Sequence, residues 1–107
     1  MATFIHDGNS IDYTPGSAVT AGAVVVQGEL VGVAKVDIPA STLGALAVTG
    51  VFDFPKATGS AITAGALCYW DATNQRATTT ASGNKLIGKC VKAAADVDTT
   101  VRVRMSQ

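Results

Sequence analysis

The sequence predicts an all-β protein: a small compact β-barrel or sandwich of repeated β-turn-β units, preceded by an N-terminal arm. Its apolar runs are short, rich in Val, Ile and Thr, and interrupted by Gly every few residues, which is typical of strands. The segment 17–24, Ser-Ala-Val-Thr-Ala-Gly-Ala-Val, returns at 60–67 as Ser-Ala-Ile-Thr-Ala-Gly-Ala-Leu. No stretch of useful length shows the apolar spacing of an amphipathic helix.

The repeated segment predicts a unit that is used more than once. In each copy a β-branched residue precedes Thr-Ala-Gly, and Gly22 or Gly65 can take a positive φ at no steric cost. A weaker third copy begins at Ile38 and has Ser41 where the glycine would be. We therefore expect one β domain over residues 17–107, with residues 1–16 as the arm.

The expected strands follow from the apolar runs and the turn signals between them. Hairpin turns are expected at 27–29 and 72–75. In the last run Val101, Val103 and Met105 alternate with two arginines, as in a half-buried strand. The expected strands are 3–6, 11–13, 23–27, 30–35, 46–54, 67–71, 76–79, 85–92 and 99–105.

Composition argues against several classes of function. The chain has 107 residues and a formal charge of zero, so it lacks the excess of Lys and Arg that drives non-specific nucleic-acid binding. Lys89, Lys92, Arg102 and Arg104 form a small basic strip that we expect to pair with carboxylates of a neighbouring strand or subunit. No apolar run approaches the ~20 residues of a membrane span, and the N-terminus does not read as a signal peptide. Synthesis in a cytoplasm is expected, with Cys68 and Cys90 as buried thiols.

The segment 83–90, Gly-Asn-Lys-Leu-Ile-Gly-Lys-Cys, comes close to a phosphate-binding loop. Cys90 stands where such a loop needs Ser or Thr to coordinate magnesium. Lys89 lies in an apolar β-run with no helix after it, whereas the chemistry requires backbone amides at a helix start. We interpret the segment as a strand with a small residue at Gly88.

No other pattern indicates catalysis, a metal or a cofactor. His6 is the only histidine, and two cysteines without Cys-x-x-Cys spacing make no four-ligand set. Asp96 and Asp98 lack the other oxygen ligands of a calcium loop and are interpreted as part of a solvated turn. The sequence predicts no catalytic residue, no metal site, no cofactor and no small-molecule substrate.

The order of these segments resembles the phage cement family of small capsid decoration proteins, which automated naming has also called RecA/RadA-type phage recombinases. The resemblance covers nearly the whole chain. It rests on the Phe4 to Tyr13 arm, on Val-Thr-Ala-Gly-Ala-Val-Val-Val at 19–26, on Leu-Val-Gly-Val-Ala-Lys at 30–35 and on the run from Ile38 to Lys56. It continues with Ile-Thr-Ala-Gly-Ala-Leu at 62–67 and Leu-Ile-Gly-Lys-Cys-Val at 86–91. The recombinase name is not supported, because the one segment that comes close to a phosphate-binding loop departs from the pattern at Cys90.

The resemblance implies a structural virion protein that decorates and stabilises a phage capsid, made in the bacterial cytoplasm and bound as a homotrimer to the outer surface of the head. Its partner would be the major capsid protein, and the protein itself would have no enzymatic activity. From position and side-chain type we expect the arm to bind the capsid. The apolar middle segment 43–55 is expected either to be buried in the core or to lie in a subunit contact. The expected anchors of the arm are Phe4, Ile5, His6, Ile11 and Tyr13, and the expected subunit contact consists of Val51, Phe52 and Phe54.

Two alternatives of other classes stay open. One is a small β-barrel that binds nucleic acid in phage recombination or packaging, for which the basic strip is the feature to test. The other is a different virion component of the head–tail junction or the tail, which composition does not separate from a decoration protein.

Overall fold

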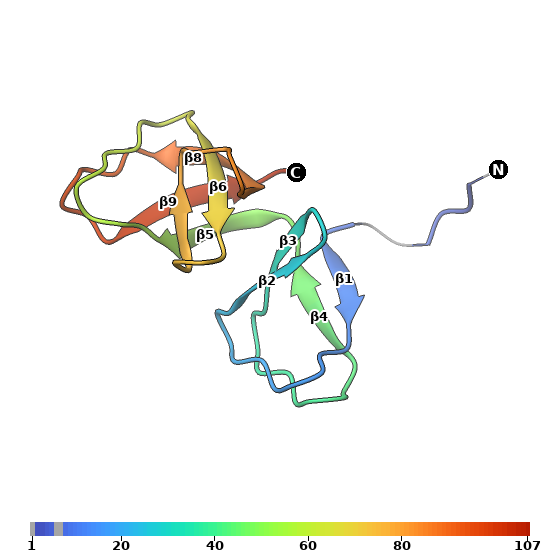
Figure 1. Ribbon diagram of the computed structural model, residues 1–107. Helices are drawn as coiled ribbons and strands as arrows, with labels where there is room; N and C mark the ends of the chain where they lie inside the picture. Colours follow the sequence, from blue (N-terminus) through green and yellow to red (C-terminus); the bar gives the residue numbers. More distant parts are fainter. Residues whose placement is uncertain (1, 6–7) are drawn as a thin grey trace.

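The computed structural model describes residues 2–5 and 8–107. This part of the chain contains nine strands and no helix, which confirms the predicted all-β class (Figure 1). The strands form two antiparallel sheets, in the orders β1-β4-β3-β2 and β5-β9-β8-β6-β7. Their bounds are β1 (Ser10–Tyr13), β2 (Val24–Gln27), β3 (Leu30–Val33), β4 (Gly44–Ala47), β5 (Gly50–Pro55), β6 (Leu67–Asp71), β7 (Arg76–Thr78), β8 (Lys85–Lys92) and β9 (Thr100–Met105).

The predicted strand over 46–54 is wrong as a single element, because the chain changes sheet within it. β4 ends at Ala47, and β5 begins at Gly50, whose φ of 115° suits a glycine corner. The apolar run 43–55 does not reveal this break, because both of its halves are strand-forming. At the predicted first strand, Thr3–Ile5 forms no strand, and His6 lies outside the described residues.

The predicted turns and the predicted strand at 11–13 are present. Gly28 and Glu29 join β2 to β3, and Ala72–Gln75 joins β6 to β7. β1 pairs with β4, with Ile11 opposite Leu46. Part of the expected arm 1–16 is therefore an edge strand of the first sheet.

The first copy of the repeated segment packs its corner on the end of β3. Gly22 has a φ of 88°, and its N–H donates to the Ala34 carbonyl at 2.6 Å. The Ala34 N–H donates in turn to the Ala23 carbonyl at 3.0 Å. An antiparallel bridge between Val19 and Ile38 follows on the other side of the corner.

The second copy makes the same contacts on β8. Gly65 also has a φ of 88°, its N–H donates to the Cys90 carbonyl at 2.7 Å, and the Cys90 N–H donates to the Ala66 carbonyl at 2.9 Å. The bridge that follows joins Ile62 to Ala94. The two halves of the chain are thus one unit used twice.

The correspondence extends to every strand of the first sheet. β1, β4, β3 and β2 occupy the places that β5, β9, β8 and β6 occupy in the second, and β7 is the additional strand of the second copy. The residues that form the two cores also stand at corresponding positions of the unit. The corresponding pairs are Ile11 and Phe52, Tyr13 and Phe54, Val19 and Ile62, Val25 and Cys68, Ala34 and Cys90, Ile38 and Ala94, and Leu46 and Val103.

The weaker third copy has the same turn geometry. Ser41 has a φ of 60°, a left-handed conformation that is uncommon for a residue other than glycine. The Thr42 N–H donates to the Pro39 carbonyl at 3.2 Å, as the Ala23 N–H donates to the Thr20 carbonyl at 3.1 Å. Backbone geometry therefore supports the sequence match at Ser41.

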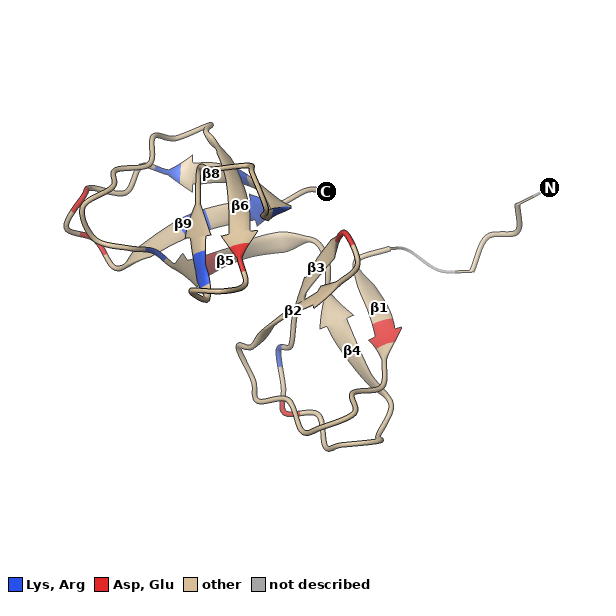
Figure 2. Cartoon of the chain, in the orientation of Figure 1, with Lys and Arg blue, Asp and Glu red and all other residues tan. Residues whose placement is uncertain are grey.

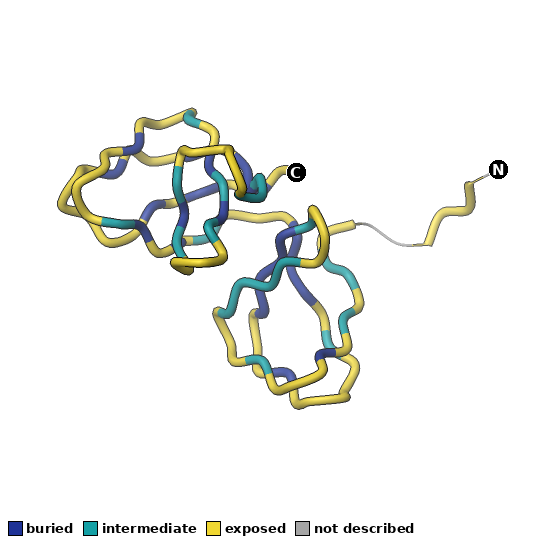
Figure 3. The backbone as a smooth tube through the Cα atoms, viewed as in Figure 1, coloured by how far each residue is buried: buried dark blue, intermediate teal, exposed yellow. Residues whose placement is uncertain are grey.

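The two copies share a core, although they form two lobes in Figure 1. Leu46, Ile38 and Ala34 form the small core of the first lobe. Figure 3 shows buried segments in both lobes. The second lobe holds the larger core, and Val31 and Val33 of β3 pack into it. The hairpin of β2 and β3 therefore contributes to both cores and holds the lobes together.

The C-terminal side chain adds a polar link between the lobes. The Val31 N–H donates to Oε1 of Gln107 at 2.7 Å, and Nε2 of Gln107 donates to the carbonyls of Val31 at 2.7 Å and Val48 at 3.3 Å. The amide of Gln107 thereby substitutes for a neighbouring strand beside part-buried backbone of β3.

Substitution of Gln107 by alanine is expected to lower the free energy of unfolding by about 1–3 kcal/mol, because it leaves the Val31 N–H and carbonyl without these partners. Urea denaturation measures the change. Ser106→Ala is the matched control, because the Ser106 backbone bond to Ile87 is kept. Equal stability of the two variants would contradict a role for the side chain in joining the lobes.

Candidate functional site

The described part of the N-terminal arm is extended and exposed. Phe4 is 80% exposed and Ile5 79% exposed, although both side chains are large and apolar. Figure 1 shows this segment leading away from both lobes. Exposed apolar residues at the tip of a free segment mark a place for contact with another protein.

The other expected anchors of the arm lie elsewhere. Ile11 and Tyr13 belong to β1 and pack, partly buried, against the core residues Ile38 and Leu46. They hold the edge strand on its own sheet, so they are not free in the way Phe4 is. His6 lies outside the described residues.

The residues expected to form the subunit contact do not share one surface. Phe54 is only 1% exposed, and its ring lies 6.0 Å from that of Trp70 in the larger core. Phe52 lies on the same face, with its ring 6.4 Å from Phe54 in an edge-to-face arrangement, and is partly buried. Val51 points to the other face and is exposed, because side chains alternate along a strand. Phe54 is therefore a core residue in this fold and not a surface residue.

Sequence reasoning missed several exposed apolar side chains outside the arm. Val91 follows the buried Cys90, where the pairing of β8 with β9 shifts its register. That irregularity breaks the alternation that would have revealed the residue. The others stand in loops or at a strand end and carry no period: Val36, Leu43, Leu67 and Val97.

The predicted basic strip is present on the outer face of the second sheet. Lys89 lies opposite Arg104 and Lys92 opposite Arg102, as the β8–β9 register requires. Of the eight basic residues of the chain, only Lys35 precedes β5, so the positive charge gathers on the second lobe (Figure 2).

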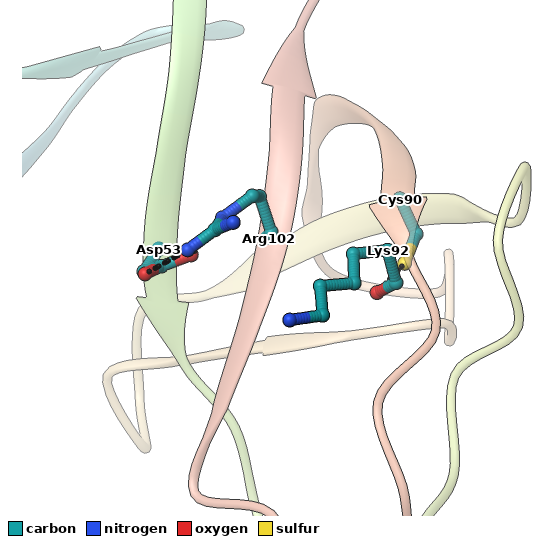
Figure 4. A network of polar contacts seen from close by, with 4 residues as sticks. All are labelled: Asp53, Cys90, Lys92 and Arg102. Carbon is teal, nitrogen blue, oxygen red and sulfur yellow. Dashed lines mark hydrogen bonds and ion pairs between the residues drawn. The ribbon is translucent and has the colours of Figure 1, made fainter.

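A carboxylate of the neighbouring strand neutralises part of this strip. Nε of Arg102 donates to Oδ1 of Asp53 at 2.9 Å, and Nη2 donates to Oδ2 at 3.2 Å (Figure 4). This hydrogen-bonded pair lowers the pKa of Asp53 below its ordinary value, with a smaller contribution from the charge of Lys92. The pair confirms the expected carboxylate partner on a neighbouring strand.

Beside this pair lies a shallow polar hollow of about 270 Å³. It is bordered by Asp53, Lys92, Asp98 and Arg102, with backbone of the loop before β9. Charges of both signs line it, and in the described part of the chain no three His, Cys, Asp or Glu side chains gather as a metal site would require.

The two cysteines are free thiols within the larger core. Burial, together with the neighbouring Cys90, raises the pKa of Cys68 to about 11, so this thiol is protonated at neutral pH. The Cys90 thiol donates to the Lys92 carbonyl at 3.0 Å. Because they occupy the places of Val25 and Ala34 in the first copy, the cysteines act as small apolar residues.

The segment 83–90 does not have the geometry of a phosphate-binding loop. Gly83 and Asn84 belong to a turn, and β8 begins at Lys85, so the backbone amides enter a sheet ladder. Gly88 and Cys90 are buried in that strand, while Lys89 points to solvent. The interpretation as a strand with a small residue at Gly88 is confirmed.

Lys56 is a buried cation that the sequence did not reveal. Its ammonium donates to the carbonyls of Ala57 at 2.7 Å and Ser60 at 2.5 Å, and so closes the loop before the second copy of the repeat. A parallel bridge between Lys56 and Ala77 also brings the two edges of the second sheet together. The only sequence signal is its position directly after the proline of β5, which is too common to be diagnostic.

Comparison with known proteins gives one match. No curated protein and no solved structure matches the chain. Separately, the described part of the chain has no helix that is long and apolar enough to cross a membrane. The family model described as phage cement protein matches residues 5–105, which is nearly the whole chain and includes both copies of the unit. The chain therefore belongs to the phage cement protein family.

Proposed function

We propose that this protein decorates and stabilises a phage capsid, and that it binds the outer surface of the head as a homotrimer with the major capsid protein as its partner. The family match over residues 5–105 carries the proposal, because a cement protein is associated with the capsid and structural in role. That role points away from enzymatic activity, and the proposal includes none. We propose further that the protein is made in the host cytoplasm before assembly.

The physical basis of the proposed function is preferential binding to the assembled shell. A protein that binds the shell and not its dispersed subunits stabilises the shell by mass action. A trimer that touches several capsid subunits gains avidity, so each copy needs only a modest contact. The exposed Phe4 and Ile5 supply such a contact in each copy, and we assign them to the capsid.

We propose that the trimer contact uses those expected residues whose side chains reach the surface. Of the expected residues only Val51 is exposed and Phe52 partly so, whereas Phe54 is enclosed. Val51 lies opposite Arg104 in the β5–β9 register, so a contact there would also cover part of the basic strip.

The experiment that tests the function is co-sedimentation of the purified protein with expanded, undecorated heads of its phage, combined with a thermal scan of those heads. Saturable binding and a higher melting temperature of the shell are expected. Absence of binding to mature heads would refute the decoration role.

The basic strip favours one other function, binding of single-stranded nucleic acid. Lys89 and Arg104 support it, because neither pairs with a carboxylate of the described residues. The Asp53–Arg102 pair and the zero net charge oppose it. A salt-dependent shift of single-stranded DNA at micromolar protein would favour this function over decoration.

A further inference from the structure

β2 is an edge strand whose outward backbone has no strand beside it in the described chain. Gln27 and Leu30 close the two-residue turn, and the Ala34 N–H bonds to the Ala23 carbonyl, so residues 23, 25 and 27 bond to β3. In an antiparallel pair the alternate residues point the other way. The N–H and carbonyl groups of Val24 and Val26 therefore face outward from the sheet.

The second copy of the unit shows this same edge covered. β6 corresponds to β2, and its outward residue Tyr69, which corresponds to Val26, pairs with Thr78 of β7. β7 belongs to the longer connection between β6 and β8, whereas Gly28 and Glu29 alone join β2 to β3. The first copy has the same edge but lacks the strand that covers it.

The edge also lacks the features by which proteins protect exposed strands. Charged residues and proline on an edge strand oppose pairing with another chain. The other edge strands carry them: Asp12 in β1, Asp53 and Pro55 in β5, and Arg76 in β7. The sequence of β2 is Val-Val-Val-Gln, with no charge and no proline. Of the edge strands described, β2 is the one suited to accept a further strand.

The geometry points to strand addition at β2: an extended segment of a capsid subunit pairs with the outward backbone of Val24 and Val26. β7 indicates the chemistry of that segment, since its central residue Ala77 is small and buried against the sheet and its neighbours are partly exposed. The incoming strand needs about three extended residues with a small or apolar side chain at the centre.

The assignment of the strand to the capsid rests on the proposed function. A second copy has its own open β2 edge and its N-terminal arm to offer. Pairing of two β2 edges would form a two-fold dimer and not the proposed trimer, and the arm is assigned to the capsid. The arm leaves from β1, at the opposite edge of the same sheet from β2. Contacts at both edges allow one sheet to bridge two capsid segments, as a stabiliser of an assembled shell requires.

Proline at position 26 tests the pairing directly. Val26→Pro removes the outward N–H and keeps the bonds between β2 and β3, because Val26 does not bond to β3. Val26→Ala is the matched control, since it shortens the side chain and keeps the N–H. The affinity for undecorated heads is expected to fall at least about fivefold for Val26→Pro relative to Val26→Ala. If Val26→Pro melts below the assay temperature, Val24→Pro with Val24→Ala replaces the pair.

Each outcome separates this inference from the function on which it rests. Equal head binding by the proline and alanine variants, with wild-type binding intact, overturns strand addition alone. If Val26→Pro instead changes the sedimentation of the free protein, the edge belongs to a contact between copies, and the assignment to the capsid is overturned. Absence of binding by the wild-type protein refutes the proposed function itself.

Discussion

Replacement of Gly88 by alanine is expected to lower the melting temperature by about 10 °C or more, the largest loss of stability expected from a single methyl group in this chain. A Cβ at this position would lie 1.9 Å from the Arg104 carbonyl oxygen and 2.8 Å from the Ser106 nitrogen. Both are backbone atoms of the neighbouring chain segment and cannot move aside as a flexible side chain can. β8 and β9 would have to separate at the centre of their sheet.

Thermal unfolding followed by circular dichroism measures this effect. Gly16→Ala is the matched control, because a Cβ there meets no atom within 4 Å, and its stability should change by less than about 0.5 kcal/mol. If the Gly88→Ala protein had the melting temperature of the wild type, close approach of the two strands would not set the β8–β9 register.

Removal of residues 2–8 is expected to abolish capsid binding and leave the fold intact. Phe4 and Ile5 are almost fully exposed, and burial of each in a partner contributes about 1.5–3 kcal/mol. Their combined loss weakens binding by about 10² to 10⁴-fold for each copy. The deletion should stop before Asn9, because the Asn9 carbonyl accepts a bond from the Val48 N–H at 3.0 Å.

Head co-sedimentation and thermal unfolding together measure this prediction. The double variant Phe4→Ser, Ile5→Ser keeps the arm backbone and should bind as weakly as the deletion. Val97→Ser is its matched control, because Val97 is equally exposed but lies in a loop of the second lobe. Full binding by the double variant would refute the arm as the capsid anchor. A deletion that continued through Tyr13 would be less informative, since it would remove β1 and uncover Leu46.

Features with a local cause were predicted well. Alternation along β9, the glycine corners at Gly22 and Gly65 and the left-handed Ser41 all depend on a few neighbouring residues, and the structure contains each of them. The doubling of the whole unit was predicted only in part. Outside the repeated segment the two copies differ in sequence: Cys68 and Cys90, for example, take the places of Val25 and Ala34. Their backbone hydrogen bonds and bridges reveal which residues correspond.

The candidate site was predicted less completely, because exposure is not a local property. Phe4 and Phe54 are both large aromatic residues in apolar segments, yet one is 80% exposed and the other 1%. The difference depends on whether Trp70, far along the chain, packs against the residue. Similarly, nothing in the run Val-Val-Val-Gln tells whether a strand lies on both of its sides.

The sequence by itself determined the all-β class, the turns, the glycine corners of the repeated segment and the membership of the cement family, since these depend on residue types and their order over short distances. The tertiary structure alone decided that 46–54 divides between two sheets and that Phe54 is enclosed. It also decided that no described strand covers the outer edge of β2, whereas β7 covers that of β6. The physical reason is that pairing and burial are set by contacts between distant segments. A strand-forming sequence specifies its own conformation but not the neighbour that completes it.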